Sequence, residues 1–160
     1  MMNSVMRDYY PIFAMYQALR TQLMDLLTDE DLQYRAGGTN PTLGALCHEL
    51  GETEHAYIAS FRTFTHDYSY RHPEPALEGS VQALSSWFSE LDLRLKEAVE
   101  GLSDDDLEHR VIDRGGDFRL PPRIQLEVYK EALLIFYGKT DVYLKAMGKA
   151  LPTQWREWIG

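Results

Sequence analysis

Apolar residues recur every three or four positions along four long stretches of the chain, the spacing of one α-helical face. The first three stretches carry one stripe each: Val5, Tyr9, Ile12, Tyr16, Leu19, Leu23 and Leu26; Leu43, Cys47, Leu50, Tyr57, Phe61 and Phe64; and Val81, Leu84, Phe88, Leu91, Leu95, Val99 and Leu102. Glu54 interrupts the second stripe. The fourth stretch, from Pro122 to about Met147, carries two stripes, so we expect it to be the most buried helix. No stretch alternates with a period of two, and the pattern predicts an all-α fold.

Residues typical of helix ends flank these stretches. Pro11 lies inside the first, so that helix is expected to begin or bend there. Asn40-Pro41 suits a helix N-cap and first turn, Gly79-Ser80 a helix start, and Gly148 followed by Pro152 a helix end. Four helices of about 20 residues span roughly 30 Å each, which predicts a four-helix bundle.

The connections differ in length and character. Residues 28–40 and 103–121 are long enough to cross the bundle, whereas 67–79, with its two prolines, is expected to be turn-like. The decapeptide Leu27–Ala36 resembles Leu102–Val111, and Gly-Gly follows each copy. In both copies a hydroxyl side chain, of Thr28 or Ser103, can cap a short acidic helical turn. The chain is interpreted as two helix–acidic turn–helix units, or as one capping solution used twice by chance.

Composition indicates one domain over residues 1–160, with a short aromatic tail over 151–160 that packs on the bundle or on a second subunit. The chain has 160 residues, 44% of them hydrophobic, a net charge of −9 and one cysteine, Cys47, on an apolar stripe. The acidic balance argues against a nucleic-acid partner. No leader peptide or membrane-spanning run is apparent, so a cytoplasmic location and no membrane association are expected.

The second stretch holds the most informative polar residues. His48, Glu52 and His55 fall within one helical face, with Gly44 and Gly51 on the same stripe. Glycines beside a histidine leave room for a ligand, an ion or a neighbouring helix. Imidazole and carboxylate four residues apart suit zinc, nickel or iron, but a third ligand must come from another helix. The alternative is a buried histidine that is hydrogen-bonded to Glu52 or to a tyrosine.

The sequence resembles the DinB/YfiT-like superfamily of four-helix bundles over nearly its whole length. Members share a helix reading roughly S-I-G-x-L-hydrophobic-x-H-hydrophobic-x-x-x-E, matched here to the segment from Thr42 through His48 to Glu52. Near the C-terminus they commonly read H-x-x-x-H-R-G-Q, then L-R-x-hydrophobic-G-x-x-x-P, matched here from Ala132 to Pro152. The resemblance implies a superfamily that includes metal-dependent thiol S-transferases and thiol-dependent isomerases.

The family's three metal ligands are one histidine on the second helix and two on the last long helix. His48 is matched to the first, but Ala132 and Phe136 occupy the other two positions. We therefore expect no cofactor and no usual three-histidine metal centre. A rescued site for a divalent metal (Zn, Ni or Fe) would use His48, Glu52 and Glu131.

The favoured hypothesis is a divergent member that binds a small molecule in a central metal-free pocket, with His48 and Glu52 as candidate catalytic residues. The expected pocket residues are His48, Glu52, His55, Tyr129, Phe136 and Tyr137. One alternative is a divalent-metal-dependent enzyme, a thiol S-transferase or hydrolase, with a rearranged site. The other is a non-catalytic interaction module, and a homodimer is expected.

Overall fold

The computed structural model describes all residues from 1 to 160 and consists of helices with one very small sheet. Its four long helices are α1 (Tyr10–Leu26), α2 (Leu43–Thr63), α3 (Val81–Glu100) and α5 (Pro122–Ala146). The short elements are the π-helix η1 (Val5–Tyr9), the 3₁₀ helices η2 (Asp31–Gln33) and η3 (Pro75–Gly79), the helices α4 (Asp104–His109) and α6 (Thr153–Trp158), and the strands β1 (Ile112–Asp113) and β2 (Arg119–Leu120). The predicted all-α four-helix bundle is confirmed, apart from the antiparallel β1–β2 hairpin, which the sequence pattern did not indicate.

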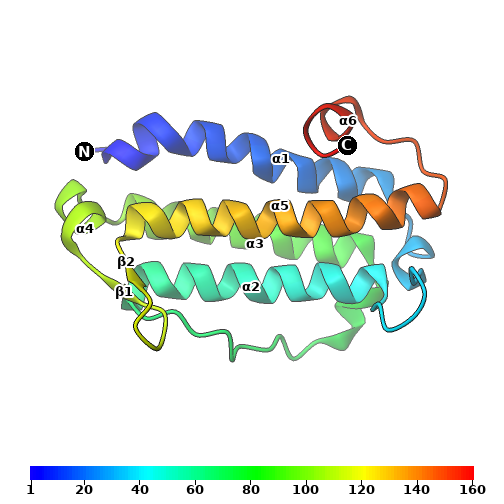
Figure 1. Cartoon of the computed structure of the whole chain (residues 1–160), viewed down its shortest axis with the longest axis horizontal. Helices are drawn as coiled ribbons and strands as arrows, with labels where there is room; N and C mark the ends of the chain where they lie inside the picture. Colours follow the sequence, from blue (N-terminus) through cyan, green and yellow to red (C-terminus); the bar gives the residue numbers. More distant parts are fainter.

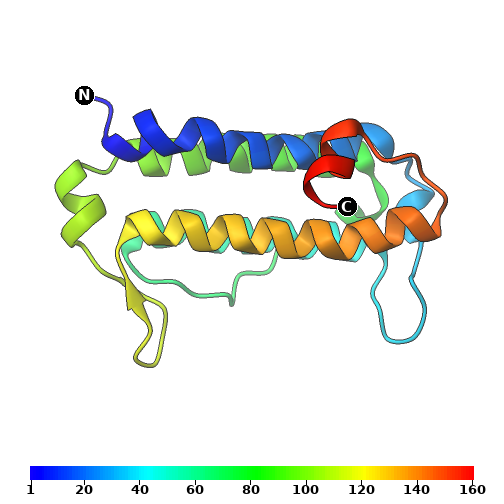
Figure 2. The same cartoon turned by 45° about the horizontal axis from the view of Figure 1, so that its top comes forward.

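The long helices that follow each other within one half of the chain, α1 with α2 and α3 with α5, lie diagonally opposite in the bundle. α1 packs against α3 and α5, and α2 packs against the same two helices. Figures 1 and 2 show that α1 and α5 run in one direction and α2 and α3 in the other. The connections after α1 and α3 therefore cross the bundle end, as their lengths predict.

The helix starts follow the predicted capping chemistry with one correction. Ser80 caps α3 by accepting a hydrogen bond from the Ala83 amide, as predicted. α2 is capped by Thr42, whose hydroxyl accepts from the Ala45 amide, and not by Asn40. Asn40 instead donates its side-chain amide to the Gly37 carbonyl and closes the preceding turn. η1 ends at Tyr9 and α1 begins at Tyr10, next to Pro11, in agreement with the expectation that a helix begins at this proline.

The two acidic turns have the same hydrogen-bonding pattern. In one, Thr28 and Asp31 bond to each other's backbone amides; in the other, Ser103 and Asp106 do the same. The glycine pairs that follow have nearly equal left-handed φ angles, 89° and 56° for Gly37-Gly38 and 89° and 58° for Gly115-Gly116. A matching backbone conformation of this kind favours two equivalent units over a chance repeat.

Each acidic turn also caps the start of a helix in the other unit. The Asp29 carboxylate accepts from the Val81 amide at the start of α3, at 2.9 Å. The Asp104 carboxylate accepts from the Ser4 amide just before η1, at 2.7 Å. The negative charge at these positions therefore lies at the positive ends of helix dipoles.

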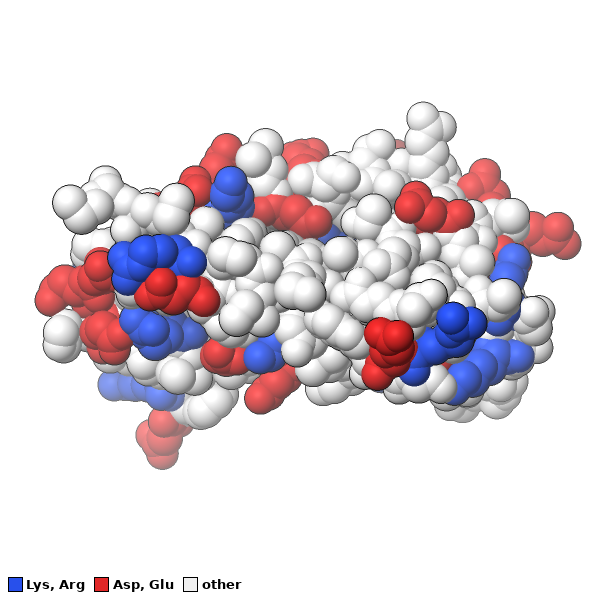
Figure 3. Space-filling view, turned by 90° about the horizontal axis from the view of Figure 1, so that it is seen from above, with Lys and Arg blue, Asp and Glu red and all other residues white.

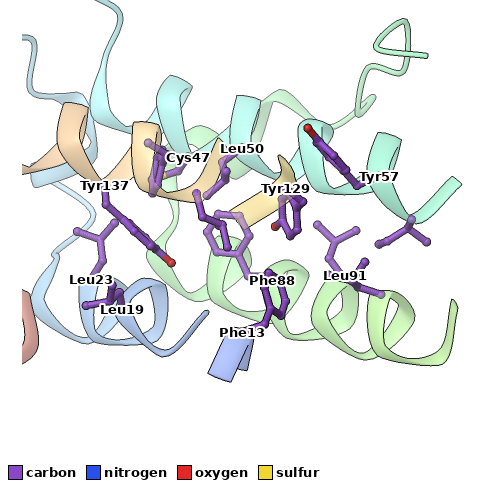
Figure 4. Close-up of a cluster of buried hydrophobic side chains, with 14 of the residues drawn as sticks. Phe13, Leu19, Leu23, Cys47, Leu50, Tyr57, Phe88, Leu91, Tyr129 and Tyr137 are labelled. Atoms are coloured by element: carbon purple, nitrogen blue, oxygen red, sulfur yellow. The ribbon is translucent and has the colours of Figure 1, made fainter. Parts of the chain in front are cut away.

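The core fills the space between the four long helices. Figure 4 shows aromatic and aliphatic side chains from all four meeting there, including Phe13, Tyr57, Phe88 and Tyr137. Cys47 is fully buried among them, and burial raises the pKa of its thiol to about 12, so it is a packing residue. Trp155 of α6 is also fully buried and donates its indole N–H to the Leu19 carbonyl at 2.9 Å. The aromatic tail thus packs back on the bundle.

The connection between α2 and α3 is not turn-like. It forms a strap, residues 64–74, that runs along α2 for most of the bundle length (Figure 1) and ends in η3. Alternate residues of the strap pack on the bundle. Their ring centroids lie 4.6 Å (His66 to Tyr57), 3.6 Å (Tyr70 to His55) and 4.6 Å (His72 to Trp87) from their partners. Alternation of this kind is typical of an extended segment with one buried side.

The surface shows mixed charge. On the face seen in Figure 3, acidic and basic side chains are interspersed at both ends and sparse in the middle. No helix combines the length and the apolar character that a membrane crossing needs.

Two helical glycines offer a matched test of this packing. A Cβ at Gly51 would overlap the Trp87 ring, whereas one at Gly138 would meet no atom within 4 Å. We expect Gly51→Ala to lower the free energy of unfolding by about 1–3 kcal/mol through overpacking. Gly138→Ala is expected to raise it by about 0.5–1 kcal/mol, since alanine favours the helix. Urea unfolding of both variants checks this, and equal effects would contradict the described contact between α2 and α3.

Candidate functional site

A polar pocket lies on α2, between the strap and η3. It measures about 540 Å³ and is lined by Ala45, His48, Glu49, Glu52, Thr53, Tyr68, Arg71 and Glu78. A second hollow of about 470 Å³ continues past Ala45 and Glu78. α2 supplies most of one wall because its residues 45, 48, 49 and 52 share one face of the helix.

His48 is the most buried polar group of this pocket, with 8% of its surface exposed. Its Nδ1 lies 3.0 Å from Glu78 Oε1, and its Nε2 lies 3.5 Å from Glu52 Oε1. A carboxylate only accepts hydrogen bonds, so Nδ1 carries the proton toward Glu78. Nε2 has no hydrogen-bond partner. In the neutral ring, two acceptors therefore face each other between His48 and Glu52.

The surrounding residues hold this arrangement in place. Glu52 Oε1 accepts from the His72 amide at 3.0 Å, which ties the strap to α2. The His72 and Trp87 rings pack against the His48 ring with centroids 5.8 and 5.7 Å away. Gly44 and Gly51 admit the η3 backbone at Glu78 and the Trp87 ring. The room that these glycines leave is therefore used for helix and loop packing.

The structure brings together only two of the six residues expected to line one pocket, His48 and Glu52. His55 stacks on Tyr70 beside a separate hollow, and burial lowers its pKa. Tyr129 is in the core between Phe13 and Tyr57, and the Tyr137 hydroxyl donates to the Tyr16 carbonyl. Phe136 lines a different groove, described next. The three α5 residues are separated from His48 because it faces α3 and η3, whereas α5 lies on another side of α2. His55 is separated because it lies about two turns further along α2.

That groove, between α2 and α5, measures about 150 Å³. Its lining residues are Leu46, Glu49, Leu50, Thr53, Ala132, Ile135, Phe136 and Lys139. Glu49 is thus the α2 residue opposite Ala132 and Phe136 whose side chain could bind a metal ion. Glu131 is exposed and does not line the groove.

A cluster of polar side chains that the sequence analysis did not predict lies inside the bundle. The Arg20 guanidinium donates to Glu54 Oε2 at 2.6 Å and to Asp92 Oδ1 at 2.5 Å. It also stacks on the Phe88 ring, with 4.3 Å from Cζ to the ring centroid. Gln17 donates to the same oxygen of Asp92. The interruption of the α2 stripe by Glu54 was the available signal for this cluster.

One guanidinium donates hydrogen bonds to two carboxyl groups here, and this environment shifts the pKa of Glu54. Complete burial raises the pKa of Glu54 to about 8, and Asp92 adds to the effect, although Arg20 opposes it. The folded-state pKa exceeds the ordinary value of 4.5. The contribution of Glu54 to stability is therefore complete below that value and is lost as the pH rises toward 8. The cluster lines none of the described pockets, so we assign it to the fold.

Comparisons with known proteins place the chain in a family. A family model described as the DinB superfamily matches residues 14–132, most of the chain. The chain belongs to the DinB superfamily. A DinB-like protein from Bacillus cereus ATCC 10987 is similar in structure, with a TM-score of 0.70, 19% identity and coverage of 86% of this chain and 88% of the other.

A DinB-like protein from Bacillus subtilis has a TM-score of 0.69 and 17% identity, with coverage of 88% of this chain and 92% of the other. A comparison with curated proteins finds no match. At these identities the two structures support the fold and not a shared activity.

The structure corrects the assignment of the superfamily motif to this chain. Counted one by one from Thr42, the histidine of the motif falls on Glu49 and its glutamate on Glu54. Glu49, Ala132 and Phe136 line the same groove, as three ligand positions must. His48 and Glu52 therefore do not correspond to these motif positions.

The residues at these positions do not fit a metal centre. Only Glu49 offers a ligand atom, since Ala132 has none and Phe136 fills space with an apolar ring. No group of three His, Cys, Asp or Glu side chains in the structure is arranged to hold an ion, and this includes His48, Glu52 and Glu131.

Two histidines added to α5 should create a metal site that depends on Glu49. In Ala132→His/Phe136→His, the new imidazoles are four residues apart and face Glu49, giving the His₂Glu set known for zinc. We expect zinc to bind in a 1:1 ratio by calorimetry with tag-free protein, while the wild type binds none there.

A further substitution in that variant tests the corrected motif assignment. Glu49→Gln should weaken zinc binding by about tenfold or more, a loss of about 1.4 kcal/mol. His48→Gln should leave it unchanged. The opposite result would return His48 to the ligand position of the motif.

Proposed function

We propose that this DinB-superfamily protein binds a small polar molecule in the pocket at His48, without the three-histidine metal centre. The pocket formed by α2, the strap and η3 takes the place of the central pocket expected from the sequence. One observation carries the proposal: His48, whose buried Nε2 has no hydrogen-bond partner, lines an open pocket of about 540 Å³.

An unpartnered buried nitrogen is costly, at about 1–3 kcal/mol, and a ligand that supplies its hydrogen bond recovers this energy. The volume of the site agrees with this role, since small-molecule pockets typically measure about 300–1,000 Å³. If the bound molecule reacts, His48 is placed to accept a proton through Nε2, with Glu78 orienting the ring through Nδ1.

The alternative of a metal-dependent enzyme lacks a ligand set in this structure. The homodimer and the interaction module stay predictions from the sequence.

Ligand-observed NMR with a library of small polar molecules tests the proposal. We expect binders whose dissociation constants rise about tenfold or more in His48→Gln, the equivalent of about 1.4 kcal/mol. His109→Gln is the matched control because His109 is exposed and paired only with Asp105. It should bind as the wild type does, and circular dichroism should show both variants folded.

A library in which no molecule binds, or in which every binder ignores the His48 substitution, would contradict the proposal.

A further inference from the structure

We infer that the ligand of the His48 pocket is an organic cation, an amine or a related N–H donor. This inference rests on the proposed function and names the chemical class of the bound molecule. Two independent observations carry it: the charge of the pocket lining and the geometry between His48 and Glu52.

The lining is predominantly acidic. Three carboxylates, those of Glu49, Glu52 and Glu78, face one guanidinium, that of Arg71. The Arg71 side chain is 70% exposed and donates to the carbonyls of Tyr68 and Tyr70, so its hydrogen-bonding capacity is directed to the strap. Its Nε lies 3.9 Å from Glu52 Oε2, beyond hydrogen-bonding distance. With neutral His48, the lining carries a net charge of −2 (three carboxylates against one guanidinium).

The geometry at His48 calls for a donor rather than an acceptor. With the proton on Nδ1 toward Glu78, Nε2 of the neutral ring carries a lone pair and lies 3.5 Å from Glu52 Oε1. A ligand ammonium with several N–H groups can donate to both acceptors at once, and its charge strengthens both bonds. A carboxylate or phosphate there would add a third acceptor and repel the two already present.

The space and the nearby aromatic ring suit such a ligand. The Tyr68 ring lines the pocket, and aromatic faces attract cations. The adjoining hollow beyond Glu78 admits the rest of an elongated molecule. The recognition group is therefore expected at His48, Glu52 and Glu78.

Calorimetry at low ionic strength with matched probes tests the inference. The cations are 1,4-diaminobutane and benzylamine, and the neutral partners of equal shape are butane-1,4-diol and benzyl alcohol; succinate is the anion. We expect at least one amine to bind the wild type, and its alcohol partner and succinate to bind at least about tenfold more weakly.

Variants at the pocket locate the effect. Glu52→Gln and Glu78→Gln should each weaken amine binding by about 10–100-fold, since a hydrogen bond to a charged group is worth about 1.5–3 kcal/mol. Glu90→Gln is the control because Glu90 is exposed on α3 and outside the pocket, and it should bind as the wild type does. Added salt should weaken binding in the wild type.

The outcomes separate this inference from the proposed function. If neither amine binds, or the alcohols bind as tightly, the cation inference is overturned. In that case, His48-dependent binders of other chemistry in the NMR library would leave the proposed function standing. If neither experiment gives a His48-dependent ligand, both are overturned.

Discussion

A charged guanidinium in the middle of the bundle is the constraint on which the rest of the structure depends. Arg20 of α1 has 2% of its side chain exposed, and its partners Glu54 and Asp92 come from α2 and α3. A buried charge is tolerated only when it is paired and hydrogen-bonded, so these three helices must keep one register and one rotation. That rotation of α2 directs Glu54 inward and leaves His48 and Glu49 to face different neighbours.

The orientation of α2 explains why the His48 pocket and the groove at Ala132 and Phe136 are separate hollows in this chain. His48 faces η3 and Trp87, whereas Glu49 borders both hollows and lies opposite Ala132 and Phe136 in the groove. With Ala132 and Phe136 at two of the motif's ligand positions, Glu49 is the acidic side chain that lines this groove. The pocket at His48 adjoins that groove and is formed by α2 with the strap and η3.

Much of the fold could be predicted from the sequence because helical periodicity and capping residues are local signals. The site could not, because adjacent residues of a helix point about 100° apart, and a motif misplaced by one position moves a side chain to another face. The sequence does contain the correct register, because the motif counted residue by residue from Thr42 places its glutamate on Glu54. The alternation of His66, Tyr68, Tyr70 and His72 was also readable, but its docking on α2 depends on contacts distant in sequence.

The free energy of unfolding of Arg20→Met, measured by urea denaturation, tests the central role of the buried cluster most directly. Removal of the guanidinium leaves the Asp92 carboxylate without a counter-charge and the buried Glu54 carboxyl group without its hydrogen bond, and we predict a loss of about 3–5 kcal/mol. The control is Arg94→Met on α3, whose exposed pair with Glu90 at 3.9 Å should contribute at most about 0.5 kcal/mol. Equal losses in the two variants, or a loss below about 1 kcal/mol for Arg20→Met, would contradict the account.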